Sequence, residues 1–170
     1  IQVDMPKLHD KAIVRLDIDE VSKFLDVVEY GPQNMSQRKQ KFHEHNKVRD
    51  LAIMTLLLGT GMRVTELVGI NLRDLDFANG RVKVTRKGGY EAYIYFGDEV
   101  ADALSKYVDE RENIKDIKVG HEDALFLSTR KSRITVRSIE LMVKDYSSYI
   151  TTVKKITPHK LRSTYGTALY

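Results

Sequence analysis

Residues 58–67 read LGTGMRVTEL, and this stretch decides the fold. It completes an apolar segment, residues 46–58, whose composition predicts a helix that is buried on nearly every side. The glycines at its centre end that helix, and a short helix over residues 64–68 is expected to follow. The break therefore presents Arg63 at the start of a new helix. Glu66 lies three residues further on, where its carboxylate can orient the arginine.

The composition is that of a globular domain. The chain has 170 residues, of which 42% are apolar and 31% are charged, enough for one domain with a sizeable core. It has no cysteine, which excludes disulfides and cysteine-ligated zinc. The longest apolar run is too short to span a bilayer, and the first residues are not those of a signal peptide. Because the sequence does not begin with Met, we expect it to be a fragment.

The charge is unevenly distributed. The formal net charge is +4, from 28 basic and 24 acidic residues. Ordinary surface charge explains any single cluster, but several basic clusters coincide with a loop or a motif, which favours a polyanionic partner. The basic clusters span residues 38–49, 81–87, 130–137 and 154–162, and the acidic residues concentrate in 98–123.

The remaining patterns predict an α+β fold that is predominantly helical, with a small antiparallel sheet or β-hairpin. Residues 1–15 are interpreted as a linker and residues 16–170 as one domain. Alternating residues in 81–84 and 90–96, with glycines between them, predict the hairpin. Periodicity and capping signals predict the other elements: helices over 17–30 and 98–112, a helix opening at Thr135, a last helix from Thr157, an exposed loop over 36–45, and a short strand or extended piece over 124–127.

Two further motifs carry chemistry beside Arg63. Lys87 lies at the tip of the predicted hairpin, where it can reach into a groove and donate a proton. His159 and Arg162 share one face at the start of the last predicted helix, and free N–H groups and a histidine–arginine pair suit a phosphate. Each motif alone also has a structural explanation: an Arg–Glu pair, a lysine in an exposed turn, or a surface histidine and arginine.

Taken in order, the three motifs resemble those of the tyrosine recombinase (phage-type integrase) family. The order is Arg63, then Lys87, then His159-x-x-Arg162. Residues 58–67, followed by LRDLD at 72–76, are similar to the family's first arginine box. The resemblance covers roughly residues 16–170.

The resemblance implies a metal-independent transfer of a DNA phosphate to a tyrosine, without a cofactor. Arg63 and Arg162 would stabilise the phosphate, Lys87 would protonate the leaving 5′-oxygen, and His159 would assist at the tyrosine or hold the phosphate. Glu66 would support Arg63. The implied substrate is double-stranded DNA, bound by a homo-tetramer that is a monomer without DNA. A bacterial mobile element or phage, acting in the cytoplasm at the nucleoid, is the implied source.

The sequence departs from the family's pattern in several places. Ser163 follows Arg162 where many members carry another histidine, and Glu91 stands where a further basic residue is common. Arg86 is therefore the adjacent alternative to Lys87. No tyrosine has the position of the family's nucleophile, since Tyr170 would still belong to the last predicted helix. We therefore expect the nucleophile, and an N-terminal DNA-clamping domain, outside these residues, and the fragment alone to be inactive.

Two other polar clusters, at residues 43–45 and 128–133, have a structural as well as a functional interpretation. Residues 43–45, His-Glu-His, are interpreted as a solvated loop rather than a metal site, because no third ligand is near. The loop over 128–133 is interpreted as a DNA-backbone contact, with a solvated basic loop as the alternative. The residues predicted to contact DNA are Arg86, Arg130, Lys131, Arg133 and Lys160.

Two alternative functions stay open. One is a type IB topoisomerase, which uses a similar set of residues but relaxes supercoils without strand exchange. The other is a DNA-binding module whose catalytic residues are vestigial or structural. The enzyme interpretation requires that Arg63, Lys87, His159 and Arg162 converge around one phosphate-sized hole in a basic groove.

Overall fold

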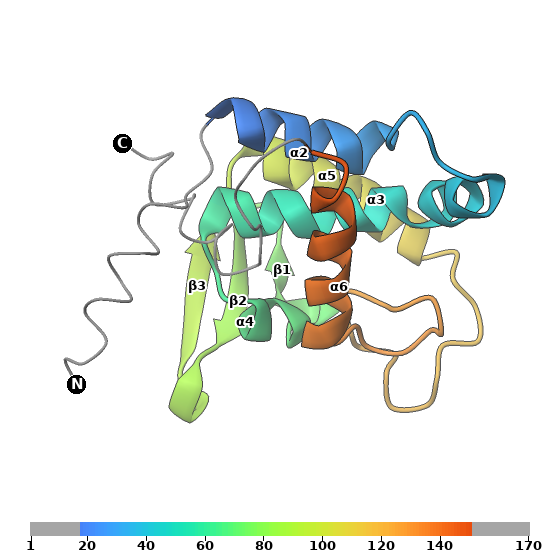
Figure 1. The fold of residues 1–170 in the computed structure, drawn as a ribbon. Coiled ribbons are helices and arrows are strands. Elements are labelled where there is room, and N and C mark those ends of the chain that lie inside the picture. The colour runs from blue at the N-terminus through green and yellow to red at the C-terminus, as the bar shows by residue number, and fades with distance from the viewer. Residues whose placement is uncertain (1–17, 151–170) are drawn as a thin grey trace, which may run out of the picture.

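The computed structural model describes residues 18–150 and confirms a mainly helical α+β fold (Figure 1). Its elements, in chain order, are α2 (Ile18–Tyr30), α3 (Gln37–Thr60), α4 (Val64–Val68), a 3-10 turn (Leu72–Asp74), β1 (Leu75–Asp76), β2 (Arg81–Thr85), a second 3-10 turn (Lys87–Gly89), β3 (Glu91–Tyr95), α5 (Asp98–Arg111) and α6 (Val136–Ser147).

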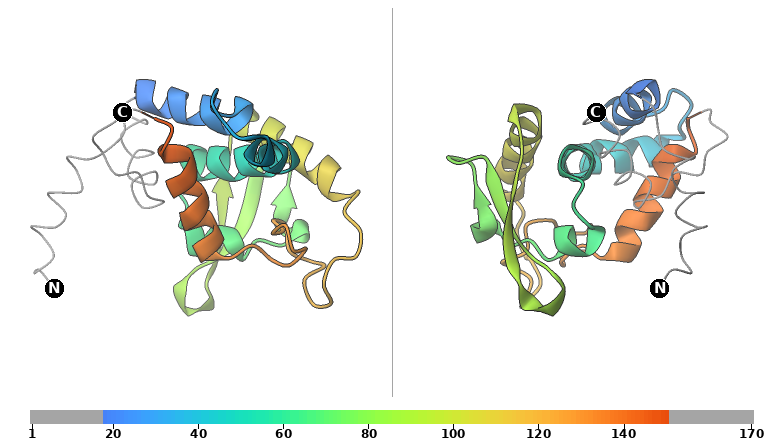
Figure 2. Two further views of the ribbon diagram at one scale, coloured as in Figure 1. Left: turned by 45° about the vertical axis from the view of Figure 1, so that its right-hand side comes forward. Right: turned by 90° about the vertical axis from the view of Figure 1, so that its left-hand side faces the viewer.

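Helix α3 is the centre of the domain. Two turned views show it between the sheet and α5 on one side and α6 on the other, with α2 beside it (Figure 2). Its residues 51–58 are apolar apart from Thr55, and Ile53, Met54 and Leu56 have no exposed surface. A helix surrounded by other elements on every side buries apolar residues on every side, as the sequence predicted.

The sheet is small and antiparallel, with strand order β1-β2-β3. In β2 the side chains alternate, so that Val82 and Val84 are buried in the core and the residues between them face outward. Val82 pairs with Leu75 of β1 and with Ile94 of β3. The β2–β3 hairpin is confirmed, and β1 is an additional short strand that the pattern did not predict.

Residues 37–45 are helical, and the predicted exposed loop over 36–45 was wrong. Ser36 is the N-cap of α3, and its hydroxyl accepts a hydrogen bond from the Lys39 N–H at 3.3 Å. A run of Gln, Arg and Lys after a serine suits an exposed helix as well as a loop, because these residues are good helix formers. Polarity predicted the exposure of this segment correctly except at His43, which is buried, but it did not predict the conformation.

The other boundaries lie close to their predictions. Helix α4 spans the predicted residues, and α5 begins at Asp98 with Gly97 rather than Asp98 as its N-cap. Thr135 caps α6, because its hydroxyl accepts from the Ser138 N–H at 3.1 Å. The segment 124–127 is not a strand, because it bends between Ala124 and Leu127, and each of these two residues forms only a single β-bridge. The linker and the predicted last helix lie outside the described residues. Within residues 18–150, no helix is long and apolar enough to cross a membrane.

Candidate catalytic site

The end of α3 fixes the backbone from which Arg63 projects. Gly61 adopts a left-handed conformation, with φ of 69°, and its N–H donates to the Leu57 carbonyl at 2.9 Å. A residue with a Cβ is strained at this φ, which explains why a glycine ends the helix here. Met62 follows with its side chain buried in the core. The chain therefore turns sharply and enters α4 at a defined position.

Arg63 is the N-cap of α4, and its guanidinium is exposed. The Arg63 N–H donates to Oε1 of Glu66 at 2.9 Å, and its carbonyl accepts from the N–H groups of Glu66 and Leu67, each at 3.0 Å. Among residues 18–150, the Arg63 guanidinium forms no ion pair. Three hydrogen bonds therefore fix the backbone of Arg63, while its permanently charged side chain faces solvent.

Lys87 lies in the tight turn that joins β2 to β3, at the tip seen at the bottom of the sheet (Figure 1). The turn closes between Arg86 and Tyr90, whose N–H and carbonyl are 2.6 Å apart. Gly88 and Gly89 both have positive φ, at 85° and 84°, as such a turn requires. Lys87 is exposed on this turn, as the hairpin prediction expected.

One carboxylate joins the first two motifs. The second oxygen of Glu66, Oε2, lies 3.3 Å from Nε of Arg86. The Glu66 side chain is 7% exposed and that of Arg86 is 49% exposed. Glu66 therefore contacts the start of α4 through one oxygen and the base of the hairpin turn through the other. The structure thus brings the Arg63 and Lys87 segments to the same edge of the domain.

The third motif, His159 and Arg162, lies outside the described residues, as does Lys160. Their convergence with Arg63 and Lys87 stays a prediction.

The predicted DNA-contacting loop between residues 128 and 133 has two different parts. Arg130 is exposed, and Lys131 adopts a positive φ of 65° at the turn. Arg133 instead faces the protein, because its guanidinium donates to the carbonyls of Val68 at 2.9 Å and Ile70 at 3.1 Å, and also to Asn71. Arg133 thus ties this loop to the segment that follows α4.

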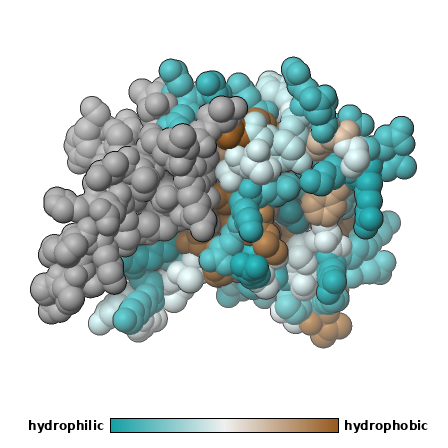
Figure 3. Space-filling view, in the orientation of Figure 1, coloured by the Kyte–Doolittle hydropathy of each residue, from teal (hydrophilic) through white to brown (hydrophobic). Residues whose placement is uncertain are grey.

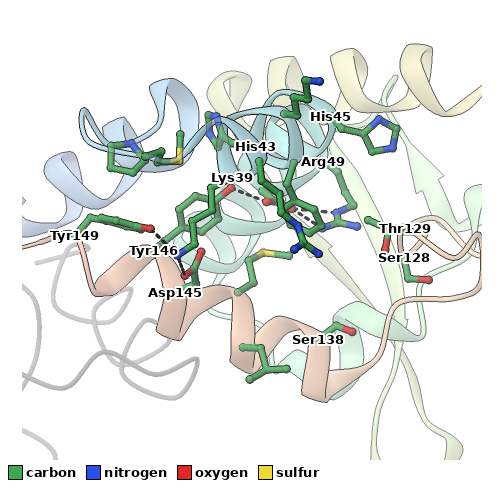
Figure 4. Close-up of a pocket in the computed structure, with 18 of the residues that line it drawn as sticks. Lys39, His43, His45, Arg49, Ser128, Thr129, Ser138, Asp145, Tyr146 and Tyr149 are labelled. Carbon is green, nitrogen blue, oxygen red and sulfur yellow. Dashed lines mark hydrogen bonds and ion pairs between the residues drawn. The ribbon is translucent and has the colours of Figure 1, made fainter.

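A groove of about 930 Å³ opens elsewhere, between the N-terminal half of α3 and α6. Neither Arg63 nor Lys87 lines it. Brown, apolar surface gathers in the middle of this face among hydrophilic side chains (Figure 3). The close-up shows labelled lining residues from both helices, including Lys39, His43, Arg49 and Tyr146 (Figure 4).

Beneath this groove lies a buried polar network that the sequence analysis missed. Asp50 accepts hydrogen bonds from Arg49, at 3.0 Å to Nε and 2.8 Å to Nη2, and from the Tyr146 hydroxyl at 2.6 Å. Arg49 also donates to the Leu127 carbonyl at 3.1 Å. Burial, and then the negative charge of Asp50, raise the pKa of Tyr146 well above its ordinary value. The network joins α3, α6 and the segment before α6.

The His-Glu-His cluster is part of α3 rather than a solvated loop. His43 is buried, and its Nε2 lies 2.8 Å from the Val28 carbonyl at the end of α2. His45 is exposed. In residues 18–150, no group of three or more metal-ligating side chains could hold a metal ion. His43 therefore has a packing role between α2 and α3.

The fold and the two described motifs define the class: a mainly helical domain with a basic hairpin beside an exposed, helix-capping arginine. The model of the phage integrase family matches residues 14–170, and the chain belongs to this family. It is 38% identical over 157 residues to the tyrosine recombinase XerS of Streptococcus agalactiae serotype III (strain NEM316), covering 89% of this chain and 43% of that protein.

Solved structures agree on the fold. The crystal structure of XerA recombinase matches with a TM-score of 0.75 and 27% identity, over 92% of this chain and 50% of that one. The Tn1549 transposon integrase, in a complex with circular intermediate DNA, matches with a TM-score of 0.67 and 26% identity, over 92% of this chain and 52% of that one. The chain spans about half the length of the relatives that it matches.

Proposed function

We propose that this chain is the catalytic part of a site-specific DNA recombinase that cleaves and rejoins strands through a 3′-phosphotyrosyl intermediate, without a metal. The observation that carries the proposal is the arrangement around Glu66. Its carboxylate holds the backbone of Arg63 and pairs with Arg86, next to Lys87. Two of the four proposed catalytic residues, Arg63 and Lys87, thus project from neighbouring segments.

In the proposed step, a tyrosine hydroxyl attacks a DNA phosphate. A bond forms between phosphorus and the tyrosine oxygen, and the bond between phosphorus and the 5′-oxygen breaks. The tyrosine proton passes to His159 or to water, and Lys87 gives a proton to the departing 5′-oxygen. Arg63 and Arg162 stabilise the extra negative charge of the pentacoordinate phosphate, since arginine matches two oxygens at once. The free 5′-hydroxyl of a partner strand reverses the step.

From the resemblance to the family, the nucleophilic tyrosine is proposed to lie in helices beyond the His159–Arg162 motif. Tyr146 is unsuited to the role, because its side chain is buried and its hydroxyl donates to Asp50. The proposal therefore assigns the nucleophile to none of the tyrosines in the described residues.

The proposed partner is duplex DNA, and four copies of the protein are proposed to bind two recombining sites. Without DNA the protein is proposed to be a monomer. The proposed place of action is the bacterial cytoplasm. Arg130, Lys131 and Lys160 are the proposed backbone contacts. Arg86 and Arg133 were also predicted to contact DNA, but each already has an acceptor within the protein, so neither is counted among the proposed backbone contacts. Most of the affinity then comes from scattered phosphate contacts and falls with salt.

Arg162→Ala in the complete protein tests the proposal. On a nicked duplex that traps the covalent adduct, we expect the adduct to disappear while DNA binding is largely kept, because Arg162 acts on the transition state. Arg73→Ala is the matched control, since it removes an exposed arginine that pairs with Asp123 and belongs neither to the proposed catalytic residues nor to the proposed DNA contacts, so trapping should stay intact. Undiminished trapping by Arg162→Ala would refute the assigned role. Relaxation of supercoils without strand exchange would favour the topoisomerase instead.

A further inference from the structure

The two oxygens of the Glu66 carboxylate contact two different segments: the start of α4 and Arg86, which is 20 positions further along the sequence. Oε1 accepts from the Arg63 N–H at 2.9 Å, and Oε2 faces Nε of Arg86 at 3.3 Å. We propose that Arg86 is a positioning residue: its ion pair with Glu66 fixes the hairpin turn so that Lys87 reaches the leaving oxygen. This inference rests on the proposed function and deepens it.

The alternation of β2 explains why Arg86 can reach Glu66. Val82 and Val84 point into the core, so the next even position continues on the face that packs toward α4. Arg86 is the last residue before the turn, and its N–H and carbonyl bond to Tyr90 and Gly89. A contact at Arg86 therefore constrains the base of the turn that bears Lys87.

Because Glu66 is buried, its carboxylate must find its partners within the protein rather than in solvent. A carboxylate that is 7% exposed requires compensating charge or hydrogen bonds, and one backbone N–H supplies only part of what an ionised carboxylate needs. In residues 18–150, Arg86 is the cation paired with Glu66. The Arg86 guanidinium therefore pairs with the Glu66 carboxylate of the same chain, whereas Lys87 beside it is exposed.

The glycines make such a constraint necessary. Gly88 and Gly89 carry no side chains that could pack against the domain, and Lys87, Gly88 and Gly89 are all exposed. The hydrogen bonds that close the turn are made by the backbone of Arg86, so the position of Lys87 depends on how Arg86 is held. A displacement of about 1 Å can cost on the order of 100-fold in the rate of a catalysed step, so anchoring of the turn has a direct kinetic consequence.

The test uses the complete protein and compares adduct formation by Arg86→Gln on two nicked duplexes. One carries the ordinary phosphodiester, and the other has sulfur in place of the bridging 5′-oxygen. A thiolate leaves without protonation, so a defect in the general acid disappears on the sulfur substrate. Lys87→Ala is the positive control for that behaviour. Arg73→Gln is the matched control for charge, because Arg73 is exposed and pairs with the exposed Asp123 at 3.5 Å.

We expect Arg86→Gln to slow adduct formation by between about 10- and 100-fold on the oxygen substrate, and to return to within about threefold of the unaltered protein on the sulfur substrate. DNA affinity and its salt dependence stay unchanged. An equal loss on both substrates, no loss on either, or a salt slope reduced by about one phosphate contact would overturn the assignment. If the unaltered protein forms no adduct at all, the proposed function fails first, and the two failures are thereby distinguished.

Discussion

Replacement of Tyr146 by Phe tests the buried network that joins α6 to α3. The Tyr146 hydroxyl donates to Asp50 at 2.6 Å, in a site where Asp50 is 3% exposed and Tyr146 is 6% exposed. Phenylalanine keeps the ring and its packing and removes only the donor. Asp50 would then keep its two bonds to Arg49, but its second oxygen would lose the tyrosine donor.

The magnitude follows from the kind of hydrogen bond. A bond to a charged group contributes about 1.5–3 kcal/mol, and a buried acceptor left without its partner bears its full desolvation cost. We therefore expect Tyr146→Phe to lower the free energy of unfolding by about 2 kcal/mol. The same change lowers the melting temperature by roughly 4–8 °C for a domain of this size.

Tyr149→Phe is the matched control on the same helix end. Its hydroxyl accepts from the Lys39 ammonium at 3.2 Å, in an exposed position. Its removal should change stability by less than about 0.5 kcal/mol. Urea unfolding of the 170-residue chain, followed by circular dichroism, measures both variants. Equal effects of the two substitutions, with unchanged m-values, would refute the argument that the Asp50 contact is the stabilising one.

Three further outcomes are expected. The pKa of Tyr146 is raised above the ordinary 10.0. The protonated tyrosine therefore stabilises the folded state below pH 10, and this stabilisation is lost as the pH rises. The free energy of unfolding, measured between pH 9 and 11, should fall with pH, and Tyr146→Phe should reduce this slope by up to about 1.4 kcal/mol per pH unit. Arg133→Ala should destabilise the chain by about 2 kcal/mol because it removes the guanidinium hydrogen bonds to the Val68 and Ile70 carbonyls and to Asn71. Arg130→Ala should leave stability unchanged but lower the salt slope of DNA binding by about one. Similar stabilities of the two variants would contradict this expectation. Gly61→Ala, at a φ of 69°, should cost about 1 kcal/mol, whereas Gly69→Ala, at a φ of −83°, should be nearly neutral in the same unfolding assay.

Local signals made part of this structure predictable. The glycine break before Arg63 and the paired glycines after Lys87 require particular backbone conformations, so α4 and the hairpin follow from a few residues. The start of α3 was not predictable in this way. A polar run without apolar periodicity is compatible with a loop and with a helix that extends beyond the core. Its N-cap, Ser36, was the available signal.

Contacts between distant residues account for what the sequence analysis missed. The Tyr146 hydroxyl and Asp50 are 96 positions apart, and no local pattern indicates that they meet. Adjacent charges at Arg49 and Asp50, next to an apolar helix segment, were a usable sign of a buried pair. Arg111 is similar: it is buried and donates to the Ala124 carbonyl, yet its position at the end of α5 suits a solvated residue equally well.

In the candidate site, too, local features were predictable from the sequence and contacts between distant residues were not. The sequence predicted Arg63 with Glu66, and Lys87 on a turn, and the structure describes them in those positions. The ion pair between Glu66 and Arg86 depends on how the hairpin packs against α4. Its existence requires the fold, and no motif spacing encodes it.

The most direct measurement is a crystal structure of the complete protein on a nicked DNA duplex. We expect the guanidinium groups of Arg63 and Arg162 each to lie about 3 Å from oxygens of one phosphate, with Lys87 directed at its 5′-oxygen and His159 beside it. Arg63 and Arg162 on opposite faces of the domain, or bound to different phosphates, would contradict the proposed catalytic site.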